Sequence, residues 1–230
     1  RIRTAVAQLC AEASFSSSIA VATEAFRQAA NSAEFFRQIR AEFGIEFNII
    51  SGEVEAYLTR LGVENRAKIL NLNLKDSLLI DLGGASTEIS FGEISRSFSF
   101  GIITALESDK RAEISMAMEF IKQFKFNNII LTSGVPTTVA ALKQGLNYAN
   151  YRADLINGVQ IKNTDLNWAA NLLKTTPNKD ELVGKNRADL IVKGCEILSN
   201  LVGFSPCIVI DDGLREGLFM AKKLNLKEIK

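Results

Sequence analysis

The chain has 230 residues, 47% of them hydrophobic, and 27 basic against 26 acidic residues leave a formal net charge of +1. This length and composition suit one large or two modest globular domains, and the near-zero charge offers no general attraction to nucleic acid or to anionic lipid. No apolar run approaches the roughly 18 to 20 residues that span a bilayer, so we expect a cytoplasmic protein without a membrane partner.

The first unit alternates short apolar runs with amphipathic stretches, a pattern typical of α/β proteins. The sequence enters a helical pattern at once, with Ile2, Val6 and Leu9 at helical spacing, and we therefore expect a fragment. The elements expected next are a strand over 19–22, a helix over 24–43, a strand over 47–50, a helix over about 52–61 and a polar inter-domain joint over 62–75.

The second unit begins with strands and continues with strand–helix alternation, which is the order of one actin-like half. A strand over 77–81 runs into a glycine-rich turn, and the alternating apolar residues beyond the turn predict further antiparallel strands. The later elements expected are a helix over 111–124, a strand over 128–131, a helix over 137–145, helices within 164–202, a strand over 207–210 and a helix over 214–224.

The turn over 81–88 reads Asp-Leu-Gly-Gly-Ala-Ser-Thr-Glu and is the strongest local signal for a ligand. Gly83 and Gly84 allow the backbone N–H groups to approach phosphate oxygens, and Ser86 and Thr87 add hydroxyl donors. Asp81 and Glu88 would then hold Mg²⁺, a cation that prefers carboxylate and water oxygens. An ordinary hairpin explains the same glycines about equally well.

Two other regions carry candidate residues. Ser133 and Gly134 follow an apolar strand and precede a helix, where free N–H groups attract anions, although local grounds favour a simple helix cap. Arg27 lies early in a helix, where its guanidinium either binds phosphate or is simply exposed to solvent. Glu53 and Glu55 either favour the helix dipole or place one carboxylate beside a bound phosphate as a general base. The absence of histidine excludes serine–histidine and cysteine–histidine nucleophile pairs.

Several of these segments together resemble the exopolyphosphatase/guanosine pentaphosphate phosphohydrolase family. The resemblance covers nearly the whole chain, and the order and spacing of the segments match as well. The segments that carry it are 21–31, 49–56, 80–88, 132–138, 151–158, 187–189 and 212–217.

The resemblance implies an α/β fold of two actin-like (ribonuclease H-like, ASKHA superfamily) domains with a cleft between them. Residues 1–70 would form the C-terminal part of domain I, incomplete at its N-terminus, and residues 71–230 would form domain II. The substrate would be polyphosphate or guanosine pentaphosphate, cleaved by water with Mg²⁺ as cofactor, and a homodimer is compatible with the family.

The resemblance also assigns roles to residues. Glu55 falls on the catalytic glutamate and Arg27 on the phosphate-gripping arginine. Asp81 and Glu88 fall on the metal or water-orienting acids. The residues that fall on the phosphate-binding loops are Gly83, Gly84, Ser86, Thr87, Ser133 and Gly134.

Three departures from the family pattern bear on activity. The usual first phosphate turn, Asp-x-Gly-Ser-Asn-Ser, is missing from this sequence, and without it we expect the polypeptide to be inactive. Ala85 replaces a glycine of the second turn, and Val54 replaces the first of two adjacent glutamates. A related phosphotransferase and a regulatory protein that binds polyphosphate or alarmone without cleaving it are the alternative functions.

Overall fold

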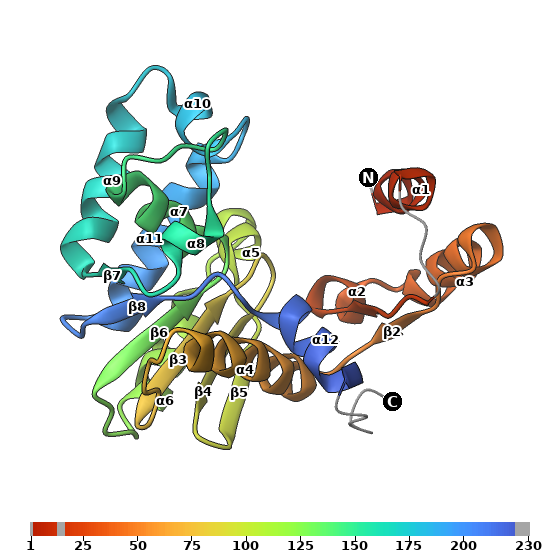
Figure 1. Cartoon of the computed structure of the whole chain (residues 1–230), viewed down its shortest axis with the longest axis horizontal. Coiled ribbons are helices and arrows are strands. Elements are labelled where there is room, and N and C mark those ends of the chain that lie inside the picture. Colours follow the sequence, from red (N-terminus) through yellow and green to blue (C-terminus); the bar gives the residue numbers. More distant parts are fainter. Residues whose placement is uncertain (1, 13–16, 224–230) are drawn as a thin grey trace.

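The computed structural model describes residues 2–12 and 17–223, and within them the strands form two sheets (Figure 1). The smaller sheet pairs β1 (Ala20–Ala22) with β2 (Phe47–Ile49) in parallel. The larger sheet has the order β5-β4-β3-β6-β8-β7, in which β3, β6 and β8 run parallel and β4, β5 and β7 pair antiparallel with their neighbours. The strands of the larger sheet are β3 (Ser77–Leu82), β4 (Thr87–Phe91), β5 (Ile94–Phe98), β6 (Asn128–Thr132), β7 (Gln160–Ile161) and β8 (Cys207–Val209).

Helices cover both faces of the larger sheet, and a smaller group surrounds β1 and β2. Within the described part of the chain, none of the helices combines the length and hydropathy needed to span a bilayer. The helices are α1 (Ile2–Glu12), α2 (Glu24–Gln28), α3 (Ser32–Phe43), α4 (Gly52–Ile69), α5 (Ile102–Glu107), α6 (Arg111–Ile121), α7 (Gly134–Lys143), α8 (Ala153–Ile156), α9 (Asn163–Thr175), α10 (Lys179–Val183), α11 (Ala188–Val202) and α12 (Leu214–Lys223).

Strand β3 lies inside the larger sheet and is buried on both faces. Because successive side chains of a strand point to opposite faces, Leu78 and Ile80 join the main core with α7, α9 and α11, whereas Leu79 packs toward α4. On the α4 side, Leu79 belongs to a smaller cluster with Val63 and Ala67. This arrangement places the N-terminal turn of α4 near the carboxyl end of β3, where the candidate acids lie.

Helices α4 and α12 cross at a contact made by glycines. A Cβ atom on Gly62 would overlap the carbonyl oxygen of Gly213, and one on Gly217 would overlap the carbonyl oxygen of Leu58. In Figure 1 the two helices lie side by side, between the larger sheet and the arm that carries β1, β2 and α3. The absence of side chains at these positions allows the two backbones to touch.

The structure confirms most of the predicted elements, but three predictions were wrong. Helix α4 continues to Ile69 instead of ending near residue 61, because Gly62 lies in a helix–helix contact and not in a linker. The expected helix over 24–43 is two helices, since the Ser32 hydroxyl donates to the carbonyl oxygens of Phe26 and Ala29 (2.6 Å) and competes with helical pairing. Helix α7 begins at Gly134, with Pro136 tolerated in its first turn.

The short elements α5, α8 and β7 were missed, because each is too short to show a clear period. The division of the chain near residue 70 into two actin-like domains stays a prediction.

We expect Gly217→Ala to destabilise the protein by more than about 3 kcal/mol in free energy of unfolding, or to prevent folding, because the new methyl group has no space against Leu58. Urea unfolding followed by circular dichroism measures this. Gly145→Ala is the control, because the position that its Cβ would occupy has no atom within 4 Å. An alanine held at the φ of +72° found there should lower the free energy of unfolding by only about 1 kcal/mol. Equal losses in the two variants would contradict the close crossing.

Candidate active site

An ion pair joins the first helices of the chain to helix α4. The Arg27 guanidinium donates from Nη1 and Nη2 to Oε2 of Glu55, at 3.1 and 3.2 Å. Its Nε donates to Glu24 (2.8 Å), and Nη1 also donates to the Ile50 carbonyl oxygen (2.6 Å). Arg27 therefore fixes the position of Glu55 relative to the end of β2.

The structure distinguishes Glu55 from Glu53, which the sequence left open. Ser51 caps α4 by accepting a hydrogen bond from the Val54 amide at 3.3 Å. In the first turn of the helix, Glu53 is exposed, whereas Glu55 has only 8% of its surface exposed and faces Arg27. Glu55 is consequently the carboxylate of the pair that lies inside the protein.

Two further carboxylates lie opposite each other on β3 and β4. Asp81 and Glu88 are register partners in the antiparallel ladder. Asp81 accepts a hydrogen bond from the Thr59 hydroxyl at 3.3 Å, and Glu88 accepts one from the Ser97 hydroxyl at 2.7 Å. Their positions follow from the hairpin, which the glycine turn closes.

Burial raises the pKa values of all three carboxylates, and neighbouring carboxylate charges add to the rise at Glu55 and Glu88. Burial raises the pKa of Glu55 to about 7 against the opposing effect of Arg27, and the Asp81 charge adds to the rise. Burial also raises the pKa of Asp81 to about 6. Burial, followed by the charges of Glu55 and Asp81, raises the pKa of Glu88 to about 8. Carboxyl groups near neutrality are suited to proton transfer and to binding a cation.

The glycine turn lies against the start of α5. The amides of Ile102 and Ile103 donate to the carbonyl oxygens of Gly83 (3.0 Å) and Gly84 (2.8 Å). Gly101 has no room for a Cβ because the Gly84 backbone lies against it. The amides of Gly84 and Ala85 have no hydrogen-bond partner among the described residues, so they are available to an anion.

A cavity of about 650 Å³ joins Glu55 to this turn. Residues of the first unit, including Thr23 and Gln28, form one wall, and Thr104 and Lys110 belong to the other. The sequence-predicted residues that line the cavity are Glu55, Gly83, Gly84 and Ser86. Its charged side chains are Glu24, Glu55, Glu107 and Lys110, so the lining is predominantly acidic.

Six other predicted residues do not line this cavity, and two of them are the paired acids Asp81 and Glu88. Arg27 donates to protein groups behind Glu55 and is absent from the cavity lining. The Thr87 side chain is fully buried, and its hydroxyl donates to the Phe100 carbonyl oxygen (2.7 Å) instead of facing the cavity. The Ser133 hydroxyl donates to the Leu82 carbonyl oxygen (2.9 Å). Gly134 lies in a different cavity.

That other cavity has a volume of about 510 Å³ and lies between α7 and the segment that precedes α11. The Arg187 guanidinium lies over the Tyr148 ring, 5.5 Å from its centroid. Burial and then the Asp211 charge raise the pKa of the Tyr151 hydroxyl, which also hydrogen-bonds to Asp211.

Sequence reasoning missed several residues that hold the acids in place. Thr59 lies four residues after Glu55 on the same face of α4, and Ser97 lies opposite Glu88 in the β4–β5 register. The helical and strand periods were visible in the sequence. The pairing of β4 with β5 at that register was not, because the turn between them lacks a decisive signal.

Asp81 and Glu88 fit a partial ligand set for Mg²⁺. The described residues contain no group of three or more Asp, Glu or Cys side chains able to hold a metal ion alone. Mg²⁺ does not need such a group, since one or two carboxylates with water and substrate phosphates are its usual ligands. The raised pKa values of Asp81 and Glu88 reflect burial of negative charge, which a divalent cation would offset.

Comparisons with known proteins identify the family of the chain. A model of the Ppx/GppA phosphatase family matches residues 4–226. A bifunctional 3-dehydroquinate synthase/phosphatase of Fusobacterium nucleatum is 25% identical over 81% of this chain and 31% of its own length. A guanosine-5'-triphosphate,3'-diphosphate pyrophosphatase of Pseudoalteromonas translucida is 29% identical over 54% of this chain and 28% of its own. Exopolyphosphatase 1 of Mycobacterium tuberculosis is 36% identical over 39% of this chain and 24% of its own length.

The chain spans about a third or less of the length of these curated relatives. Among solved structures, the Ppx/GppA enzyme of Aquifex aeolicus superposes with a TM-score of 0.71 at 25% identity, covering 96% of this chain and 80% of that one. The likeness confirms the expected actin-like α/β fold.

The raised pKa values predict how stability depends on pH. The folded protein holds protons on Glu55, Asp81 and Glu88 that the unfolded chain releases near pH 4 to 5, so stability should fall as the pH rises from about 5 to about 8. No histidine titrates in this window. Glu88→Gln keeps the acceptor for Ser97 and should raise the free energy of unfolding at pH 8 by about 1–3 kcal/mol.

Urea unfolding at several pH values without divalent cations measures the effect. Glu93→Gln, in the exposed turn between β4 and β5, is the matched control and should leave the pH dependence unchanged. Stability that is flat or rising across this window would contradict the account.

Proposed function

Because the chain belongs to the Ppx/GppA phosphatase family, we propose that it hydrolyses the terminal phosphoanhydride bond of inorganic polyphosphate or guanosine pentaphosphate. One observation carries the proposal: a buried carboxylate, Glu55, has a pKa of about 7 and lines the same cavity as the Gly83–Gly84 turn with its free amides. A general base near neutrality beside an anion-binding turn is what attack of water on a phosphate requires.

Residues on both sides of the cavity would take part. The amides of Gly84 and Ala85 would donate to oxygens of the terminal phosphate, and Lys110 would add positive charge from the same wall. We assign residues 1–70 and 71–230 to two actin-like units, because the cavity draws on both. The substrate would then bind between them.

Hydrolysis needs one proton transfer and one bond exchange. Glu55 would take a proton from water as its oxygen attacks the terminal phosphorus, and the bridging P–O bond would break with its electron pair remaining on the leaving phosphate. Arg27 would act as a positioning residue, because its guanidinium already holds Glu55, Glu24 and Ile50. Gripping phosphate with the same guanidinium would require rearrangement of these contacts.

The acidic lining makes a divalent cation a condition for binding a polyanion. We propose that Asp81 and Glu88 would hold Mg²⁺, which when bound would neutralise charge on the phosphate oxygens. The Ser97 and Thr59 hydroxyls would orient the two carboxylates for that purpose.

Glu55→Gln in the full-length protein should lower kcat for phosphate release by about 10²–10⁴-fold, because the amide cannot accept the proton. Release of inorganic phosphate from long-chain polyphosphate and from guanosine pentaphosphate, each assayed with Mg²⁺, measures this and identifies the preferred substrate. Glu53→Gln is the matched control, two residues away and exposed, and should retain near-normal turnover.

Near-normal turnover of Glu55→Gln would show that another group is the base. Tight binding by the parent protein without phosphate release would instead favour the regulatory alternative, and phosphate found on an acceptor would favour a phosphotransferase.

Arg27→Met should shift the acidic limb of the pH profile of kcat/KM upward by about one pH unit, because the Arg27 charge lowers the pKa of Glu55. A purely structural role for Arg27 would lower activity at every pH without moving the limb. Arg37→Met, on the exposed face of α3, is the control for loss of a basic residue in this part of the chain.

A further inference from the structure

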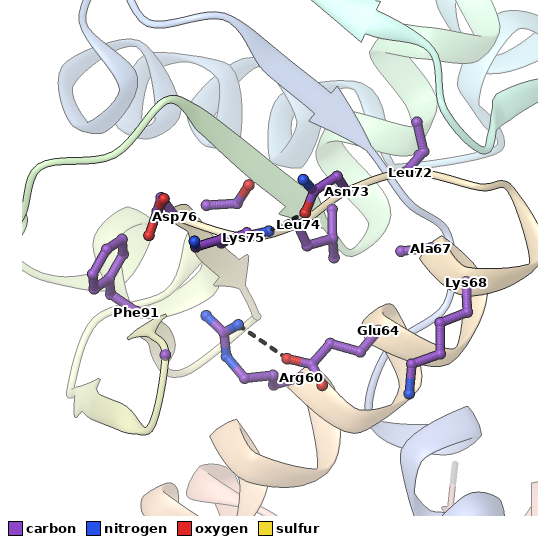
Figure 2. A pocket seen from close by; sticks show the side chains of 12 residues that line it. Arg60, Glu64, Ala67, Lys68, Leu72, Asn73, Leu74, Lys75, Asp76 and Phe91 are labelled. Carbon is purple, nitrogen blue, oxygen red and sulfur yellow. Dashed lines mark hydrogen bonds and ion pairs between the residues drawn. The ribbon is translucent and has the colours of Figure 1, made fainter.

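A separate cavity lies at the opposite end of helix α4 from Glu55. It has a volume of about 440 Å³ and lies between the C-terminal half of α4 and the segment 71–77 that leads into β3. Figure 2 shows Arg60 and Glu64 on the helix side and Asn73, Leu74 and Lys75 on the opposite side, with Phe91 at one end. Lys68 is 13 residues beyond Glu55 on α4, a separation of roughly 20 Å at the helical rise of about 1.5 Å per residue.

The end of α4 shapes one wall of this cavity. The Leu72 amide donates to the Ala67 carbonyl oxygen (2.9 Å) and the Asn71 amide to that of Lys68 (3.2 Å), which is the Schellman pattern of helix termination. Asn71 has the positive φ of 55° that this pattern needs. The chain therefore turns back along the helix and leaves a gap beside Ala67.

Ser77 contributes a hydroxyl group that the protein does not satisfy. Its residue exposure is 2%, it lines the cavity, and its Oγ is buried without a hydrogen-bond partner. Nearly all buried polar groups in folded proteins have a partner, and leaving one unpaired is costly. The Oγ atom has almost no accessible surface in this structure, so a small movement of the cavity wall is needed before a polar group of a ligand can pair with it.

The charges around the cavity favour an anion. Arg60, Lys68 and Lys75 outnumber Glu64 and Asp76 among the lining residues. Glu64 already accepts from Arg60 Nη1 (3.2 Å), and Arg60 also donates to the Ser90 carbonyl oxygen (2.9 Å). The ammonium groups of Lys68 and Lys75 have no ion pair within the part of the chain that the structure describes.

Apart from Asn73 and Gly92, the remaining lining is apolar and includes an aromatic ring. Ala67, Leu72, Leu74 and Phe91 line the cavity, and Phe91 is held by stacking on Phe124 at 5.0 Å between centroids. Small-molecule sites typically combine such an apolar wall with a few polar groups and have volumes of about 300–1,000 Å³.

We propose that this cavity is a second binding site, for a small organic anion whose apolar body lies against Leu74 and Phe91. Its phosphate-like or carboxylate group would pair with the Ser77 hydroxyl after that movement and attract the ammonium groups of Lys68 and Lys75, which come from opposite walls of the cavity (Figure 2). The site is distinct from the proposed active site, because it lies at the start of β3 and Asp81 lies near its end. It does not depend on the proposed hydrolysis.

Titration of the full-length protein with phenylphosphonate and with benzoate, followed by ¹H–¹⁵N NMR, tests the site. We expect saturable shifts of the amides of residues 72–77 and 92, and affinity at least about tenfold higher than that for phenol or for inorganic phosphate, each of which lacks one half of the ligand. The tighter of the two anions identifies the preferred charged group. Shifts confined to residues 83–86, or equal affinity for phenol or phosphate, would overturn the proposal.

Variants then test the residues. The double variant Lys68→Met, Lys75→Met should weaken binding about tenfold, whereas Lys162→Met, an exposed lysine beyond β7 at the far edge of the sheet, should leave it unchanged. Ser77→Ala should weaken binding severalfold with the melting temperature of the free protein unchanged or higher, since the hydroxyl it removes has no partner. Parent-like binding by the double variant and by Ser77→Ala would show that these groups do not form a ligand site.

Discussion

The backbone contact between α4 and α12 is the constraint on which the rest of the structure depends. Gly62 and Gly217 have no room for side chains, so the two helices can adopt only a narrow range of crossing positions. Helix α4 in turn carries Glu55 near its start, packs Val63 and Ala67 on the sheet, and forms a cavity wall near its end. A shift of this helix would therefore move Glu55 relative to Asp81 and alter both cavities together.

The proposed chemistry depends on neighbouring acidic side chains that lower the free energy of unfolding. Glu55 and Glu88 are buried and Asp81 is half-buried near them, and only Glu55 has a cationic partner among the described residues. A fold selected for stability alone would replace at least one of them, because buried like charges oppose folding. Hydrogen bonds from Thr59 and Ser97 instead hold the carboxylates of Asp81 and Glu88 in position.

Much of this arrangement could be predicted from the sequence, because the strong signals were local. The glycine turn between β3 and β4 was recognisable from residue type and spacing alone. The predictions that failed or stayed open depended on contacts distant in sequence. Gly62 was assigned to a linker because its contact with α12 is distant in sequence, and Thr87 was expected to bind phosphate because its hydrogen bond to Phe100 was not foreseen. Residue spacing alone did not separate Glu53 from Glu55, although the family resemblance assigned Glu55, the one that faces Arg27.

The crossing of α4 and α12 also has a consequence for biosynthesis. The two glycines in contact are about 150 residues apart in the chain, so at roughly 5–20 residues per second the ribosome makes the partner of α4 only about 8–30 s after α4 itself. During that interval Leu58 and the glycine face of α4 have no α12 to cover them. The nascent chain must therefore carry an uncovered apolar helix face throughout that interval, and this face is a natural binding target for chaperones.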